Sequence, residues 1–166
     1  MTGRRVLVAG IGNVFFGDDG FGVEVVRRLS ARPQRDGVQV TDFGIRGLDL
    51  AYALADGYDA AILVDAAPRG GMPGTLYVLE PAVPEVPIGA LTDTHSLEPT
   101  KILGMVRTIG GRLPVLRLVG CEPAAAADED MTMGLSAPVA AAVAEAVDLV
   151  EALVDELRAE VAAPHA

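Results

Sequence analysis

The chain of 166 residues contains few of the residues that build several common kinds of site. Its single cysteine, Cys121, excludes an internal disulfide and a cysteine-rich zinc site. Only 13 lysines and arginines stand against 23 aspartates and glutamates, for a net charge of −10, and they form no basic cluster. Nucleic acid is therefore an improbable partner, because its phosphates require lysine and arginine. No apolar run approaches the ~20 residues that span a membrane.

What is present indicates a globular protein. Half of the residues (51%) are hydrophobic and 22% are charged, and the length fits one domain, which we expect over residues 1–160 with a flexible tail at 161–166. An early apolar run at 6–9 follows two arginines, as in a signal peptide, but it stops at Gly10 without a cleavage-like site. We therefore interpret it as a first strand and expect a cytoplasmic monomer.

The most informative segment is Val6 to Val25, with the sequence VLVAGIGNVFFGDDGFGVEV. It predicts a buried strand, a glycine-rich turn and the start of a helix. Two carboxylates, Asp18 and Asp19, lie at the mouth of the turn. Glycines in such a turn indicate a phosphate site, whereas adjacent carboxylates indicate a cation site.

Strands and helices alternate along the chain. Apolar runs predict strands at 4–11, 37–43, 59–67, 75–79 and 114–120. Helical periodicity predicts a helix at 19–31, a short helix ending near Gly57, one that follows an N-cap at Ser96, and a long one at 136–159. The proline-rich residues 80–94 and the polar-to-small residues 122–133 are expected to be loops.

This alternation predicts a three-layer α/β/α domain with a mostly parallel sheet. The link between the third and fourth strands is too short for a crossover helix, so the fourth strand should run antiparallel to the third. If the second and third strands flank the first, the order begins 2-1-3. The crevice at the switch point between strands one and three then receives both Asp19 and Asp65.

The phosphate interpretation fails on the residues of the turn. Phe15 stands where a dinucleotide-binding fingerprint needs its third glycine, and aspartates follow Gly17 where a P-loop needs lysine. Carboxylates at that position would repel phosphate. Cys121, at the end of an apolar strand, is expected to be a buried structural thiol. We find no serine–histidine or cysteine–histidine nucleophile pair.

The cation interpretation rests on three residues, Asp19, Asp65 and His95, all expected on loops or strand ends at one edge of the sheet. Two carboxylates and one imidazole suit a divalent transition metal. Each residue alone has an ordinary explanation: a helix N-cap, a turn aspartate and a polar loop residue. Only their convergence on one crevice favours a site. We expect Asp18 to cap or steady the turn.

At these residues the chain resembles a known family, the nickel–iron hydrogenase maturation proteases. The resemblance rests on GIGNVFFGDDGFGVEVV, DFGIRGLDL, ILVDAAPRGGMPGTL, DTHSLEPTKIL and VGCEPAAAADEDMTMGLSAPV, and it covers residues 5–150. It implies a five-stranded mixed sheet of order 2-1-3-5-4 with strand four antiparallel, a phosphorylase/hydrolase-like fold.

The resemblance also implies an endopeptidase that removes a C-terminal extension from the hydrogenase large-subunit precursor after nickel insertion. Asp19, Asp65 and His95 fall on the family's metal-contacting positions and are its implied catalytic residues. Asp42 and Gly44 become candidate substrate contacts, although a turn aspartate explains Asp42 equally well. The nickel would come with the precursor, and zinc or cadmium could occupy the site adventitiously.

Two alternatives remain open at this point. A non-catalytic metal-sensing chaperone of the hydrogenase precursor would use the same three residues. A nucleotide-binding oxidoreductase would instead bind a dinucleotide tightly.

Overall fold

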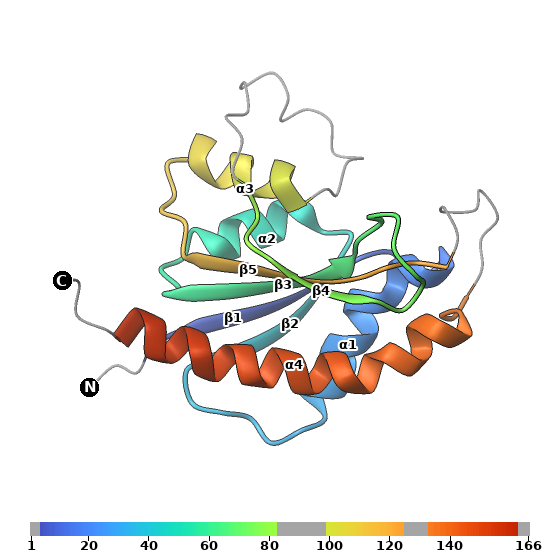
Figure 1. The fold of residues 1–166 in the computed structure, drawn as a ribbon. Coiled ribbons are helices and arrows are strands. Elements are labelled where there is room, and N and C mark those ends of the chain that lie inside the picture. Colours follow the sequence, from blue (N-terminus) through green and yellow to red (C-terminus); the bar gives the residue numbers. More distant parts are fainter. Residues whose placement is uncertain (1–3, 83–98, 125–132, 163–166) are drawn as a thin grey trace.

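The computed structural model describes residues 4–82, 99–124 and 133–162, which form three layers (Figure 1). The central sheet contains β1 (Val6–Ile11), β2 (Val38–Gly44), β3 (Ala60–Ala66), β4 (Leu76–Leu79) and β5 (Val115–Cys121). Its order is β2-β1-β3-β5-β4, and only the pairing of β4 with β5 is antiparallel. The predicted sheet order and the direction of the fourth strand are confirmed.

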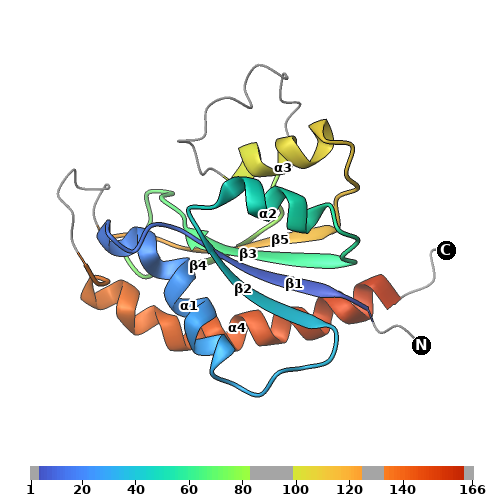
Figure 2. The ribbon, with the colours of Figure 1, turned by 180° about the vertical axis from the view of Figure 1, so that it is seen from behind.

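Helices cover both faces of this sheet (Figures 1 and 2). One face carries α1 (Phe21–Ser30) and α4 (Ala137–Ala162), and the other carries α2 (Gly47–Leu54) and α3 (Pro99–Thr108). The period-two alternation of β1 explains the two cores: Val6 and Val8 pack toward α1 and α4, whereas Leu7 and Ala9 pack toward α2 and α3. Because β1 and β3 are buried on both faces, their sequences are nearly continuous apolar runs.

Several boundaries differ from the sequence-based ones. The helix predicted from residue 19 begins at Phe21, because a short 3₁₀ turn, η1 (Gly17–Gly20), precedes it. Helix α4 continues to Ala162 and so includes two residues assigned to the tail. The predicted N-cap at Ser96 lies outside the described residues. So do residues 83–94 of the loop predicted at 80–94 and residues 163–166 of the predicted tail.

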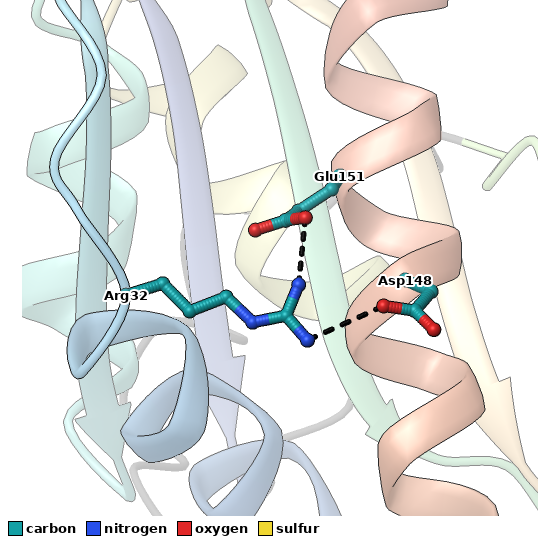
Figure 3. Close-up of polar contacts among 3 residues, drawn as sticks. All are labelled: Arg32, Asp148 and Glu151. Carbon is teal, nitrogen blue, oxygen red and sulfur yellow. Dashed lines mark hydrogen bonds and ion pairs between the residues drawn. The ribbon is translucent and has the colours of Figure 1, made fainter.

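At the amino-terminal edge of the sheet, the connection from α1 to β2 is held against α4. Figure 3 shows the Arg32 guanidinium between two carboxylates of α4, 2.8 Å from Glu151 Oε2 and 3.3 Å from Asp148 Oδ1. Arg35 pairs with Asp155 one turn further along the helix. These surface ion pairs fasten the end of the sheet opposite to the candidate site.

Even the 26-residue α4 lacks the apolar length of a membrane span, and the same holds for every other helix in the described parts of the chain.

Candidate functional site

The turn after β1 folds back on η1 and brings Asp19 to the carboxyl ends of the strands. The backbone N–H of Asn13 donates to Asp19 Oδ2 at 2.8 Å. Gly12 lies between the two aspartates: a Cβ atom there would stand 1.9 Å from the Asp19 carbonyl oxygen and 3.7 Å from Asp65 Oδ1. Its φ of 137° is also one that other residues rarely adopt. Only a glycine at position 12 therefore lets the chain pass this close to the two aspartates.

Asp65 supplies the second carboxylate from the end of β3. It is only 9% exposed, and its Oδ1 accepts a hydrogen bond of 2.8 Å from the Ala66 N–H. Burial raises the pKa of Asp65 well above its ordinary value, and the charge of Asp19 raises it further, while the Ala66 hydrogen bond partly opposes them. The effect of the Asp19 charge on this pKa shows that the two carboxylates lie close together at the carboxyl ends of the strands.

The start of α1 packs directly on the ends of β1 and β3. A Cβ atom at Gly22 would stand 2.0 Å from the Val64 carbonyl oxygen and 2.5 Å from that of Ile11. No other residue fits between helix and strands at this distance. Gly22 therefore fixes how far the Gly17–Gly20 turn lies from Asp65.

This arrangement can hold a cation between two carboxylates. Within residues 4–82, 99–124 and 133–162, the second oxygens of Asp19 and Asp65 accept no hydrogen bond. Those same ranges contain no group of three histidine, cysteine, aspartate or glutamate side chains with metal-binding geometry. His95, the third predicted ligand, lies outside them. The structure thus brings together two of the three predicted residues and leaves the third untested.

The two candidate substrate contacts lie at the same edge. The Gly44 carbonyl accepts the N–H of Gly12 at 3.0 Å, which joins the end of β2 to the turn beside the carboxylates. Asp42 is exposed, and its register partner on β1 is Gly10. Its carbonyl oxygen accepts a 2.6 Å hydrogen bond from Arg46 Nη2, so the end of this edge strand is partly covered.

Asp18 links distant segments and makes no capping bond in its own turn. Its carboxylate accepts hydrogen bonds from Ser136 N at 2.7 Å, Ser136 Oγ at 2.8 Å and Ala124 N at 2.8 Å. No side-chain cap is formed at the start of η1. The predicted steadying role therefore holds in another form: Asp18 ties the turn that carries Asp19 to the connection between β5 and α4.

Glu122 is a buried carboxylate that the sequence did not reveal. It is 4% exposed and accepts hydrogen bonds from Arg69 N, Gly71 N and Tyr77 Oη at 2.9, 2.7 and 2.9 Å. Burial raises its pKa, but these hydrogen bonds together outweigh burial and leave the pKa lowered. Its position directly after an apolar strand was the only signal available in the sequence.

The neighbouring Cys121 is buried, as predicted. Burial raises its pKa to about 11, with the charges of Asp18 and Glu122 adding to the effect. Its thiol is protonated at neutral pH and is not an activated nucleophile.

Known proteins match both this sequence and this fold. The family model for the hydrogenase maturation protease HycI matches residues 23–153. The hydrogenase expression/formation protein HupD of Rhizobium leguminosarum is 33% identical, over 87% of this chain and 71% of its own length.

Two solved structures are similar over nearly the whole chain. The hydrogenase maturating endopeptidase HybD from E. coli is 32% identical with a TM-score of 0.72, covering 92% of this chain and 93% of its own. A hydrogenase 2 maturation peptidase from a Thaumarchaeota archaeon is 36% identical with a TM-score of 0.64, covering 90% and 98%. The sequence matches and the shared fold agree: this chain belongs to the hydrogenase maturation protease family.

Proposed function

We propose that the chain is an endopeptidase that removes the C-terminal extension of a nickel–iron hydrogenase large-subunit precursor after nickel insertion, with the nickel as its recognition element. The observation that carries this proposal is the Asp19–Asp65 pair. Each carboxylate has one oxygen fixed by a backbone N–H and a second oxygen without such a partner in the described residues. Both therefore present a prearranged ligand atom to a cation that arrives with the substrate.

Nickel is part of the substrate in this proposal. Asp19, Asp65 and His95 would contact nickel already placed in the precursor, so that only the loaded precursor docks productively. Zinc or cadmium could bind the same oxygen and nitrogen ligands adventitiously, because such ligands discriminate weakly among these metals. Asp42 and Gly44 would contact the peptide beside the cleavage site.

A carboxylate of the Asp19–Asp65 pair can take up a proton in the peptide cut, because each has one oxygen without a backbone partner in the described residues. Water would add to the scissile carbonyl while its proton passes to that carboxylate. The C–N bond would then break as that proton is returned to the leaving amine.

The direct test is processing of nickel-loaded precursor by Asp19→Asn, Asp65→Asn and His95→Ala variants, with Glu24→Gln in the first turn of α1 as the matched control. We expect each of the three to lose more than about 100-fold in rate, and the control to retain activity. Full activity in all three would falsify the assignment. If nickel-free and nickel-loaded precursor are cleaved at the same rate, nickel is not the recognition element.

A non-catalytic metal-sensing chaperone of the precursor remains the alternative, because it would use the same residues. Mass spectrometry of the precursor C-terminus after mixing separates the two functions. A mass loss equal to the extension supports the endopeptidase, whereas stable binding with no mass change supports the chaperone.

A further inference from the structure

Large apolar side chains are exposed at the carboxyl edge of the sheet, on the connections and in the first turn of α2. They come after β1, after β2, between β3 and β4, and before α4; the six side chains are Phe15, Phe16, Ile45, Leu48, Met72 and Met133. We call this set the apolar rim. Across the described residues, only three other large hydrophobic side chains are comparably exposed: Tyr52, Val78 and Ile109.

The connections that carry the rim touch one another along this edge. Gly12 N donates to the Gly44 carbonyl, which joins the connections after β1 and β2. A Cβ atom at Gly17 would stand 3.9 Å from the Gly134 carbonyl oxygen, and one at Gly74 would stand 2.6 Å from that of Pro138. The connections that carry the rim therefore form a continuous line of backbone contacts along the edge that holds Asp19 and Asp65.

We infer that the apolar rim is the docking surface for the hydrogenase large-subunit precursor, which meets it with apolar side chains flanking its nickel site and cleavage segment. This inference rests on the proposed function. Asp65 lies at the end of β3 and Asp19 in η1, at the same edge of the sheet as the connections that carry the rim. Exposed apolar side chains gathered around one polar site are typical of a protein-binding surface.

Charge argues against a second copy of this chain as the occupant. The chain carries a net charge of −10, so a symmetric dimer would bring two strongly acidic molecules together. Next to Ile45 and Leu48, Asp42 is exposed and Asp49 pairs with Arg46 at 3.6 Å. A different protein with a neutral apolar face avoids that repulsion.

The test compares precursor processing by the wild type, by Ile45→Ser, and by the double variant Phe15→Ser with Met72→Ser. Tyr52→Ser on α2 is the control, because Tyr52 is 59% exposed and Ile45 is 57% exposed. We expect the rim variants to raise KM for the nickel-loaded precursor about tenfold, with kcat at saturating precursor unchanged. KM values within twofold of the control would overturn the inference.

A binding measurement keeps this inference separate from the proposed function. Calorimetry measures the affinity of each variant for nickel-loaded precursor, whether or not the peptide is cut. If the wild type binds the precursor but does not cut it, only the proposed endopeptidase activity is contradicted. Loss of affinity in the rim variants would then still support the rim as the docking surface. Wild type that fails to bind, or a dimer that the rim substitutions convert to monomer in sedimentation, would overturn the inference.

Discussion

Asp65 is a residue at which function opposes stability. Burial raises its pKa above that of the unfolded chain, so folding favours the neutral carboxyl group. That contribution to stability is fully present below the unfolded pKa of about 4 and is lost as pH rises through the folded pKa. At neutral pH, above its unfolded pKa, Asp65 therefore lowers the stability of the metal-free protein.

Asp65→Asn should consequently stabilise the metal-free fold while it removes processing. The amide oxygen can still accept the Ala66 N–H, and the repulsion from Asp19 disappears. We expect the melting temperature at pH 7 to rise by about 2–4 °C, with a smaller gain at pH 4. Calorimetric melting of both proteins at the two pH values measures this, and a lower melting temperature for the variant at pH 7 would contradict it.

The contribution of Glu122 to stability depends on pH in the opposite direction to that of Asp65. Its hydrogen bonds lower its pKa on folding despite burial, so its contribution is present above the unfolded pKa of about 4 and is lost as pH falls through the folded pKa. Glu122→Ala leaves the N–H groups of Arg69 and Gly71 without their acceptor. We expect a melting temperature several degrees lower at pH 7, a difference that narrows below about pH 4.

Glu122→Gln is the matched control, since it keeps one acceptor oxygen, and it should fall between the wild type and the alanine variant. An unchanged melting temperature for Glu122→Ala would show that these hydrogen bonds do not stabilise the loop between β3 and β4.

The sequence could predict that Asp19 and Asp65 lie close together but not the hydrogen-bond partners of Asp18 and Glu122, and the reason is separation along the chain. Asp19 and Asp65 follow apolar strands that the 2-1-3 order places side by side, so topology alone brings them together. Asp18 accepts its hydrogen bonds from residues 106 to 118 positions away. Glu122 accepts from residues 45 to 53 positions away. No local pattern records such partners.

At the scale of elements, the antiparallel β4 was predictable because residues 67–75 leave no room for a crossover helix. The 3₁₀ turn before α1 was not. Helical periodicity extends through Asp19, but the close contact of Gly22 with the strand ends requires the chain to approach through η1.

The contact of α1 with the strands predicts a graded response to alanine at two glycines. A Cβ atom at Gly22 would stand 2.0 Å from a backbone oxygen, whereas one at Gly20 would stand 3.2 Å from its nearest atom, Val14 Cα. Gly22→Ala should lower the free energy of unfolding by about 1–3 kcal/mol, because the helix must move away from the sheet. Gly20→Ala should cost less than about 1 kcal/mol.

Urea unfolding of both variants measures these costs, and the processing rate reports the position of the turn. We expect Gly22→Ala to lose activity as well, since any shift of α1 moves Asp19 relative to Asp65. Equal stability of the two variants would contradict the packing argument.

At the scale of the whole molecule, the two ends of the sheet differ in kind. The carboxyl edge carries the buried carboxylates Asp65 and Glu122 and the apolar rim. The connection at the amino edge is held by surface ion pairs such as those of Arg32 with Glu151 and Asp148 (Figure 3). Stability at that edge should therefore be separable from function at the other.

Arg32→Gln tests this separation. Its side chain is 44% exposed, so solvent screens both ion pairs and their loss should lower the free energy of unfolding by less than about 1 kcal/mol. High salt should shrink the difference from the wild type, because the Debye length falls to about 3 Å at 1 M. Processing should stay within about twofold of the wild type. Arg27→Gln, which breaks an ion pair within α1, is the control. A larger loss of processing in Arg32→Gln alone would show that the connection from α1 to β2 is coupled through α1 to the turn that carries Asp19.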